Sequence, residues 1–395
     1  MEALFSTHDY LVEHTKAQVR RVLMDEVDWS QRLIGIKGTR GVGKTTFLLQ
    51  YAKEHFSLGD RRCLYINMNN FYFQYRGLTD FAGEFVDKGG RVLLIDQVFK
   101  QPRWSEELRL CYDLYPQLHI VFTGSSVMRL KDENPELNGI AKSYNLRGFS
   151  FREYLNLQTG CHFHPYTLAE ILSGHEQITR QILATVDPEK YFADYLHHGF
   201  YPFFLEQRNF EENLLKTMNM MTEVDILLIK QIELKYLTKI KRLFYLLAVE
   251  GPKAPNISSL AQDIDTSRAT VMNYIKYLAE ARLINIIYPV GQEFPKKPAK
   301  VMLHNPNLIY AIYPDIAHQQ DIMETFFVNT LWKDHTVSQG SKGHSYIVDG
   351  NRKFRVVDGS EGHKARYNTD TTYALYGGGS NADNKLPLWL LGFLY

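Results

Sequence analysis

The stretch Gly38-Thr-Arg-Gly-Val-Gly-Lys-Thr45 follows the apolar run Arg32–Lys37 and precedes a helical pattern over Thr46–His55. It fits the pattern G-x-x-x-x-G-K-[ST], in which glycines let successive N–H groups point inward at phosphate oxygens. Lys44 is expected to reach the β- and γ-phosphates, and the Thr45 hydroxyl to hold Mg²⁺. The stretch therefore predicts a nucleotide-binding loop. Its expected binding residues are Gly38, Arg40, Gly41, Val42, Gly43, Lys44, Thr45 and Thr46.

Short apolar runs surround this loop and alternate with helical or polar segments, a pattern typical of a parallel sheet covered on both faces. Ligands of such sheets bind beyond the carboxyl ends of the strands. The polar motifs occur at those ends, which favours an α/β fold with the site at one edge of the sheet. The four runs are Arg32–Lys37, Arg62–Asn67, Arg91–Ile95 and Leu118–Thr123.

Two further motifs belong to the predicted site. Val92-Leu-Leu-Ile-Asp96 is a buried strand with an acid at its tip, the Walker B arrangement, in which Asp96 orders the Mg²⁺ shell. The next strand ends in Thr123-Gly-Ser-Ser126, so the hydroxyls of Thr123, Ser125 and Ser126 are candidate sensors of the γ-phosphate. A turn rich in Ser and Gly explains the same residues equally well.

Composition narrows the class of protein. A length of 395 residues favours two or three domains, and a net charge of +1 does not indicate a globally basic nucleic-acid binder. Cys63, Cys111 and Cys161 lack metal or redox spacing. The first nine residues lack the apolar core of a signal peptide, and no apolar run approaches the ~20 residues that span a bilayer. We expect a cytoplasmic, reduced protein without a membrane segment.

The rest of the chain has a coarser pattern. Helical spacing over His8–Val27 predicts an N-terminal helix with Val12, Val19, Val22 and Leu23 on one face. Residues 155–240 are helical and aromatic, and residues 241–290 suggest helices followed by a strand. From 296 onward the pattern is short strands, with helices expected at Pro306–Ile312 and Asp321–Trp332.

These motifs resemble the bacterial AAA-type (AAA_14-like) ATPases that carry a C-terminal DUF4143 domain. The resemblance is nearly end to end, and its more diagnostic parts are Ser150-Phe-Arg-Glu-Tyr-Leu155 and Tyr201-Pro202. Other shared stretches are Gly38–Thr46, Ile95-Asp96 with Pro102 and Trp104, Phe122–Ser126, Tyr195-Leu196 with Gly199, the segment near 258–287, Lys297-Pro298 with Lys300-Val301, and Leu386–Trp389. The resemblance implies ATP and Mg²⁺ as cofactors, and it is the reason for favouring ATP over other nucleotides.

The resemblance also implies a domain order. An N-terminal helix (1–30) precedes a P-loop AAA-type parallel-sheet core (31–158), a helical lid (159–238) and a winged-helix-like segment (239–295). A small α+β domain (296–395) resembling a degenerate restriction-type nuclease follows. Because AAA-type sites commonly lie between subunits, the resemblance implies a homo-oligomer.

The chain departs from the family at the hydrolytic half of the site. The family places Glu after the Walker B Asp as general base, whereas this chain has Gln97. A carboxamide orients water but takes no proton, although a positioning Gln suffices in GTPases that a finger arginine assists. The family's arginine is also missing from Leu137–Ala141; Arg129 and Arg147 are nearby substitutes, although a solvated surface cation is the favoured interpretation of either. We expect tight nucleotide binding and slow or absent hydrolysis, whether Gln97 is natural or an engineered trap.

The nuclease-like domain departs further. A restriction-type site needs an acid on one strand and Glu-x-Lys on the next. In our alignment these positions are Ser345, Arg355 and Val357, so no nuclease activity is expected. Asp349 and Asp358 leave a displaced site open, but Asp before Gly indicates a turn first.

The segment near 258–287 has helix-turn-helix character. Leu260, Ala261 and Ile264 face Val271, Ile275 and Leu278 across a turn that Ser267 would cap. The exposed candidates for DNA contact are Arg268, Thr270, Asn273 and Lys276. Glu280, Asp263 and Asp265 place negative charge beside the same surface, so both DNA contact and packing between domains stay open.

Three functions compete. The first is an ATP-dependent switch, and the second is an active ATPase that acts on DNA through the winged helix. The third is a defence- or toxin-like interaction protein whose protein partner docks on the C-terminal domain, with Phe326, Phe327 and Trp332 as candidate contacts. Helix-spaced aromatics are also typical of a core.

Overall fold

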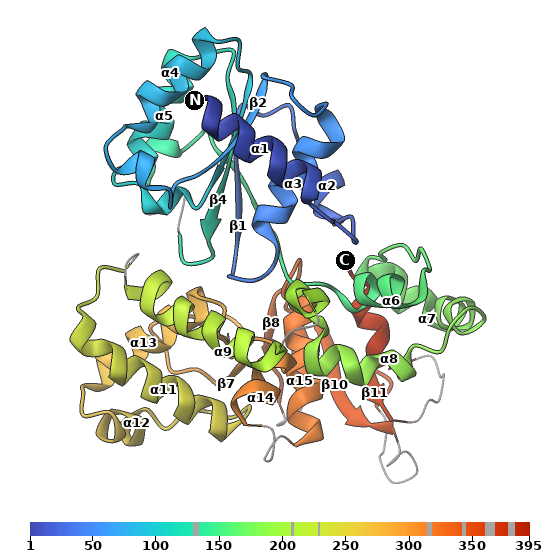
Figure 1. The fold of residues 1–395 in the computed structure, drawn as a ribbon. Helices are drawn as coiled ribbons and strands as arrows, with labels where there is room; N and C mark the ends of the chain where they lie inside the picture. The colour runs from blue at the N-terminus through green and yellow to red at the C-terminus, as the bar shows by residue number, and fades with distance from the viewer. Residues whose placement is uncertain are drawn as a thin grey trace. The chain divides into compact units, whose positions relative to one another are not determined.

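The computed structural model describes residues 1–128, 134–206, 209–227, 230–313, 318–341, 345–359, 368–377 and 384–395. The chain divides into two compact units, Met1–Gly148 and Phe149–Tyr395. Each unit is described by itself (Figure 1). The finer division into lid, winged-helix and C-terminal segments stays a prediction.

The first unit is built on a parallel sheet of five strands in the order β2-β3-β4-β1-β5. Its strands are β1 (Leu33–Gly38), β2 (Cys63–Asn67), β3 (Val92–Asp96), β4 (His119–Ser125) and β5 (Lys142–Asn145). The four apolar runs form the first four strands, as the sequence predicts. The prediction missed β5, because this edge strand is polar and only partly buried.

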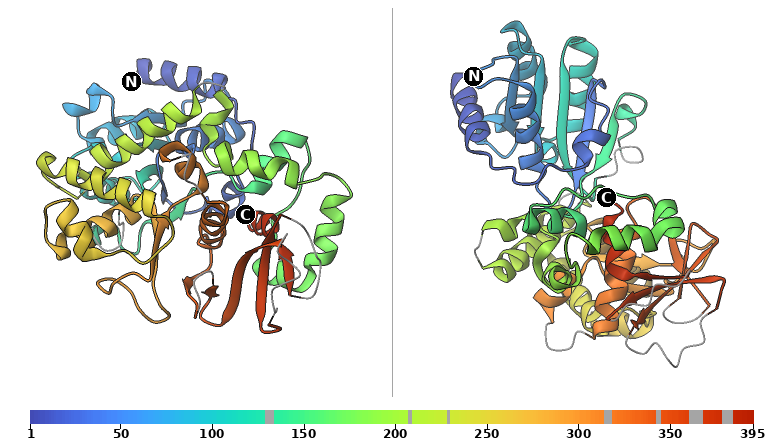
Figure 2. Two further views of the ribbon diagram at one scale, coloured as in Figure 1. Left: turned by 90° about the horizontal axis from the view of Figure 1, so that it is seen from below. Right: turned by 90° about the vertical axis from the view of Figure 1, so that its right-hand side faces the viewer.

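Helices cover both faces of this sheet (Figures 1 and 2). On one side lie α1 (Glu2–His14) and α3 (Lys44–His55), and on the other α4 (Leu78–Asp87) packs against α5 (Trp104–Leu114). Short turns of 3₁₀ helix span Phe71–Gln74, Val98–Lys100 and Pro135–Leu137.

The expected helix over His8–Val27 is wrong in its extent. α1 begins at Glu2 and ends at His14, and only the short α2 (Leu23–Glu26) follows. Phe5, His8 and Val12 form the buried face of α1 beside the edge strand β2. The chain leaves the helix at Thr15, whose backbone is extended, and later places Arg21 in a buried position.

The second unit contains a mixed sheet in the order β12-β11-β10-β9-β8. Its strands are β8 (Val337–Gln339), β9 (Ser345–Val348), β10 (Arg352–Asp358), β11 (Thr371–Tyr376) and β12 (Lys385–Pro387). The first three pair antiparallel, and β10, β11 and β12 pair parallel. α15 (Gln319–Leu331) packs on β10, and the 3₁₀ segment Leu388–Phe393 packs against α15. Phe326 and Phe327 belong to the core beneath the sheet, so they offer no surface to a partner.

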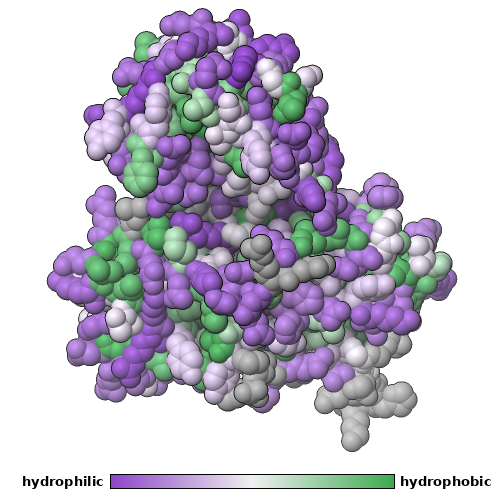
Figure 3. All heavy atoms as spheres, viewed as in Figure 1, coloured by the Kyte–Doolittle hydropathy of each residue, from purple (hydrophilic) through white to green (hydrophobic). Residues whose placement is uncertain are grey.

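Further helices and a hairpin complete this unit. The helices are α6 (Phe151–Thr159), α7 (Leu168–Leu183), α8 (Glu189–Asp194), α9 (Phe210–Met220), α11 (Leu237–Glu250), α12 (Ile257–Asp263), α13 (Arg268–Glu280) and α14 (Pro306–Ile312). Segments of π-helix follow α8 at Tyr195–Gly199 and α9 at Met221–Ile226. β6 (Ile284–Ile287) pairs antiparallel with β7 (Lys300–Leu303). Figure 3 shows hydrophobic side chains at the surface of the part that carries α9 and α11; the exposed ones include Leu215, Met220, Tyr245 and Val249.

The diagnostic box at Ser150 has a structural role. Ser150 is the N-cap of α6, its hydroxyl accepts the N–H of Glu153, and the Glu153 carboxylate accepts the N–H of Ser150. This reciprocal capping box satisfies donors that a helix start leaves unpaired. Tyr201 is fully buried, and its hydroxyl accepts a hydrogen bond from Asn305. The capping box fixes the chain where the second unit begins, and Tyr201 joins the segment after α8 to the residue before α14.

A buried ion pair joins the hairpin to α15. The Lys300 ammonium on β7 lies 2.6 Å from the Glu324 carboxylate, and both side chains are buried. The Tyr346 hydroxyl on β9 donates to the same carboxylate and accepts from Lys300 at 3.1 Å. Three elements are thus held by one set of charged hydrogen bonds.

Among the described residues, no helix is both long and apolar enough to cross a membrane.

Candidate nucleotide-binding site

The loop after β1 requires glycine at specific positions. A Cβ on Gly38 would lie 2.4 Å from the carbonyl oxygen of Leu146, so no side chain fits there. Gly41 and Gly43 have φ of 80° and 91°, in the left-handed region that favours glycine. α3 starts directly afterwards at Lys44, with Gly43 as its N-cap. The N–H groups of the first turn of α3 therefore lie at the edge where an anion would bind.

Lys44 closes this loop on itself. Its ammonium donates to the carbonyl oxygens of Gly38, at 2.7 Å, and Thr39, at 2.8 Å. Two neutral carbonyls are weaker partners for a cation than a phosphate is. The structure thus places the charge of Lys44 inside the loop, where phosphate oxygens would compete for it.

Asp96 is the centre of the site. It is only 1% exposed, at the end of β3. Thr45 donates to its Oδ2 at 2.6 Å, and the Tyr65 hydroxyl donates to the same oxygen at 2.9 Å. Thr123 on β4 donates to Oδ1. Donors from α3, β2 and β4 thus converge on one carboxylate, which fixes its position.

Tyr65 is a member of this network that sequence reasoning missed. Burial, together with the charge of Asp96, raises the pKa of Tyr65 well above its ordinary value, so the phenol stays a donor. Asn67 lies on the same face of β2 and donates to the Tyr65 hydroxyl at 3.5 Å. The available signal was the alternation in Arg62–Asn67, which puts both residues on one face of a strand next to β3.

Gln97, the residue expected at the position of the general base, follows Asp96 directly in the sequence. Its backbone is left-handed, with φ 56° and ψ 46°, and its N–H donates to the Thr123 hydroxyl at 2.9 Å. Within the described part of the chain its carboxamide has no hydrogen-bond partner. The backbone therefore positions this side chain beside Asp96 without engaging its polar end.

The three candidate sensor residues differ in what they contact. Thr123 contacts Asp96, whereas Ser125 is buried and its hydroxyl accepts the N–H of Val127 at 3.3 Å. Ser126 is half-buried. Of the two substitute finger arginines, Arg129 lies outside the described residues, and the Arg147 carbonyl accepts from Arg21.

Arg21 is the second residue that the sequence did not reveal. Its buried guanidinium donates to the carbonyls of Val42 at 3.2 Å, Arg147 at 2.7 Å and Gly148 at 3.0 Å. One side chain thus joins the loop to the last two residues of the first unit. A lone arginine in a helical pattern gives no sign of this role.

The candidate DNA contacts lie along α13. Arg268 and Asn273 are exposed, Thr270 is half-buried beside the cap Ser267, and the Lys276 ammonium lies 4.7 Å from the centre of the Phe294 ring. The expectation that Glu280 adds negative charge to this surface is wrong. Glu280 forms an ion pair with Lys230 at 3.0 Å, and both side chains are largely buried.

In the segment expected to resemble a nuclease, Ser345 lies opposite Arg355 in the pairing of β9 with β10. Asp349 accepts from His335 and Arg352, each at 2.8 Å, and sits in a turn with Gly350 at φ 76°. Over the described ranges, no group of three or more His, Cys, Asp or Glu side chains is arranged to hold a metal ion. Asp349 therefore serves the turn that its sequence indicates.

Residues 30–155 match the family model of an AAA domain, AAA_14. The first unit is an AAA-type P-loop domain. Residues 189–322 match a different model, the domain of unknown function DUF8612, and not the DUF4143 domain that the resemblance implies.

One similar protein matches part of the chain. An uncharacterized protein of Methanocaldococcus jannaschii, MJ1637, is 28% identical over 275 residues, which cover 66% of this chain and 58% of that protein. The chain thus matches less than two thirds of that relative's length. Similar solved structures include the Aeropyrum pernix ORC1 protein in complex with DNA (10% identity, 80% of this chain and 92% of that chain, TM-score 0.31). Another is C. elegans PCH-2 (14% identity, 71% and 66%, TM-score 0.24). TM-scores this low do not establish a common fold over the whole chain.

Proposed function

We propose that this protein binds ATP with Mg²⁺ at the AAA domain and acts as a nucleotide-dependent switch with slow hydrolysis. The observation that carries the proposal is the set of hydrogen bonds around Asp96, next to a Gln97 carboxamide that has no partner among the described residues. The hydrogen bonds around Asp96 suit the binding of Mg²⁺ with the nucleotide. A carboxamide at position 97 suits weak activation of the attacking water.

The residues of the loop would act together. The N–H groups of the loop and of the first turn of α3 bind the phosphates, and Lys44 turns from its two carbonyls toward them. Bound Mg²⁺ would neutralise phosphate charge. Thr45 would contribute its hydroxyl oxygen while donating to Asp96, which orders water around the ion.

Hydrolysis would be limited by Gln97. We take Gln97 to stand where the family has its base; its left-handed backbone and its N–H bond to Thr123 support this, and Glu would keep both features. Gln97 orients a water molecule but cannot accept its proton, so turnover depends on the solvent or on a group supplied by another subunit.

The test is phosphate release from Mg-ATP by the full chain and by Gln97→Glu, with nucleotide occupancy measured in both. We expect bound ATP and little turnover in the natural sequence, and at least a tenfold gain in the variant, because general-base catalysis contributes about 10²–10⁴-fold. The matched control is Gln101→Glu, which adds the same charge four residues away. Equal turnover in the natural protein and Gln97→Glu would remove Gln97 from the mechanism. Absence of ATP binding would overturn the proposal altogether.

A second candidate function is ATPase action on DNA, and the pairing of Glu280 with Lys230 favours it. With Glu280 neutralised, Arg268 and Lys276 carry the charge along α13, although Asp263 and Asp265 remain near its start. If the segment over 257–303 is a winged helix that binds DNA, Arg268→Ala with Lys276→Ala should weaken duplex binding and its salt dependence. Unchanged affinity would remove this candidate.

Three further points complete the proposal. The protein acts as a homo-oligomer in which a neighbouring subunit supplies the arginine that Leu137–Ala141 lacks. The C-terminal segment, residues 296–395, is a small α+β domain without nuclease activity, available to a protein partner. Cys63, Cys111 and Cys161 are free thiols, which suits a cytoplasmic location. Gel filtration with multi-angle light scattering, with and without ATP, tests the first point.

A further inference from the structure

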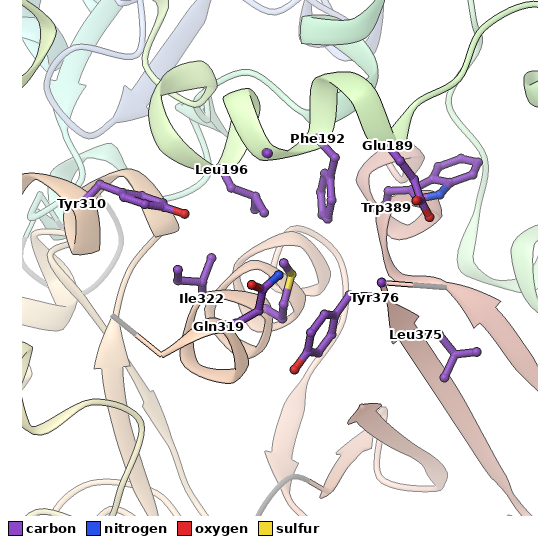
Figure 4. A pocket seen from close by; sticks show the side chains of 12 residues that line it. Glu189, Phe192, Leu196, Tyr310, Gln319, Ile322, Leu375, Tyr376 and Trp389 are labelled. Carbon is purple, nitrogen blue, oxygen red and sulfur yellow. The ribbon is translucent and has the colours of Figure 1, made fainter. Parts of the chain in front are cut away.

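The second unit contains a cavity of about 240 Å³ remote in sequence from the P-loop. α8, the π-helical segment after it, α14, the start of α15, the end of β11 and the segment after β12 all contribute to its wall. Figure 4 shows Phe192 and Leu196 pointing into it from one side and Ile322 from the other. Its wall is mainly aromatic and aliphatic, with Phe192, Leu196, Tyr310, Ile322, Tyr376 and Trp389 as principal members.

Few polar groups line this cavity, and three of them are unengaged within the described part of the chain. Among the described residues, the carboxylate of Glu189, the hydroxyl of Tyr310 and the amide of Gln319 have no hydrogen-bond or ion-pair partner. Burial raises the pKa of Tyr310, so its hydroxyl remains a neutral donor. A mostly apolar wall with a few converging polar groups is the usual composition of a small-molecule site.

The charge of the wall is of one sign. Among the described residues that line the cavity, Glu189 is the single charged one, and no Lys, Arg or His accompanies it. Aromatic faces attract cations, so Phe192, Tyr310 and Trp389 add to the preference set by Glu189. An anionic ligand would meet repulsion from Glu189 with no compensating donor cation.

The volume limits the size of the ligand. At about 30 Å³ per molecule of water, the cavity holds about eight. An apolar cavity of about 150 Å³ accommodates benzene. The space therefore suits one aromatic ring with a short chain.

We propose that this cavity binds a small monocationic arylalkyl amine, with the ring among the aromatic side chains and the ammonium at Glu189. Tyr376 anchors the wall, because its hydroxyl donates to Gln320 at 3.0 Å, and Gln320 donates to Glu324 at 2.9 Å. The ligand site thus rests on the buried ion pair of Glu324 with Lys300. Binding there requires no nucleotide, so it is independent of the proposed ATP site.

The test uses three probes of similar size and different charge: phenethylamine, 2-phenylethanol and 3-phenylpropionate. Ligand-observed saturation-transfer NMR on the full chain, titrated to a dissociation constant, suits the weak affinity of ligands with about ten non-hydrogen atoms. We expect phenethylamine to bind most tightly, the alcohol severalfold more weakly, and the acid not at all.

Variants locate the site. Ala193 lines the cavity and is exposed on α8, so Ala193→Trp fills the entrance without altering the core and should abolish binding. Glu189→Gln should weaken the amine about threefold, as expected for an exposed ion pair, and leave the alcohol unchanged. Glu211→Gln is the matched control, since Glu211 is also exposed in the first turn of a helix. Binding that survives Ala193→Trp, equal affinity for amine and alcohol, or no binding of any probe would overturn the proposal.

Discussion

Thr45 donates a hydrogen bond of 2.6 Å to Oδ2 of Asp96, although 51 residues separate them in the sequence. This contact closes the edge of the sheet at which the P-loop of β1 and the tip of β3 meet. Its function is measurable through Mg²⁺. In Thr45→Ala we expect about tenfold weaker nucleotide binding with Mg²⁺ and unchanged binding in EDTA, because the variant removes a metal ligand and leaves the N–H groups intact. Equal losses in both media would mean that Thr45 shapes the loop and does not hold the ion.

Tyr65 should tune the same carboxylate. Tyr65→Phe removes one of three donors to a buried acid at little cost in volume, so we expect the free energy of unfolding to fall by about 1–3 kcal/mol. The Mg²⁺ concentration needed for half-maximal nucleotide binding should also change. Tyr115→Phe is the control, because it removes a hydroxyl that donates to the carbonyl of Thr79 in the same unit. An identical Mg²⁺ response in both variants would exclude a role for Tyr65 at the ion.

His8 should make the edge of the sheet sensitive to acid. Its Nδ1 accepts the backbone N–H of Tyr65 at 3.0 Å, which requires an unprotonated nitrogen. Burial lowers the pKa of His8 below its ordinary value of 6.5, the charge of Arg61 lowers it further, and Asp9 opposes them. Because the folded-state pKa is lowered, the stabilisation is complete above pH 6.5 and is lost as the pH falls through the folded-state value.

Hydrogen exchange across Cys63–Asn67, corrected for intrinsic rates, measures this effect. Protection should decline between pH 7 and pH 5 in the natural protein. In His8→Gln, whose amide accepts the same bond without titrating, protection should stay constant. His14→Gln, on the exposed side of α1, should behave like the natural protein. A parallel decline in all three proteins would assign the acid sensitivity to another group.

The ion pair of Lys300 with Glu324 should behave as a buried pair. Glu324→Gln or Lys300→Met alone should lower the free energy of unfolding by about 3–5 kcal/mol, since each leaves an uncompensated buried charge. The double variant should lose less than either single one, because no charge then remains. Calorimetric melting of the four proteins gives the comparison. Additive losses in the double variant would show that the two residues act separately.

Much of the first unit could be predicted because its signals are local. The glycines of Gly38–Thr45 predict the loop and the apolar runs predict the strands, each from a few neighbouring residues. The structure contains both the loop and these strands. β5 was missed because its residues are polar and its pairing with β1 is set by tertiary contact. The expected N-terminal helix was too long because the spacing of apolar residues over His8–Val27 carries no information about tertiary contacts. Arg21 donates to carbonyls that are distant in the sequence, outside any continuous helix.

The sequence predicts the residues expected to bind the nucleotide and Mg²⁺, but it does not predict the residues that hold them in place. Asp96 and Thr123 follow from their places at strand ends, whereas the contact of Tyr65 with Asp96 depends on the pairing of β2 with β3. The burial of Glu280 depends on Lys230, 50 residues earlier, and no local pattern joins them. The division of residues 149–395 into domains is likewise beyond what local patterns establish.

The single guanidinium of Arg21 has a mechanical meaning. It donates hydrogen bonds to the carbonyl of Val42 in the loop and to the carbonyls of residues 147 and 148, where the first unit ends. If the loop changes shape, residues 147 and 148 must therefore move with it, or the buried guanidinium loses a hydrogen bond. The lost bond would cost about 1–3 kcal/mol of stability. Arg21 thus couples the conformation of the P-loop to that of residues 147 and 148. Neither segment can change shape without the other or without the loss of a hydrogen bond to Arg21.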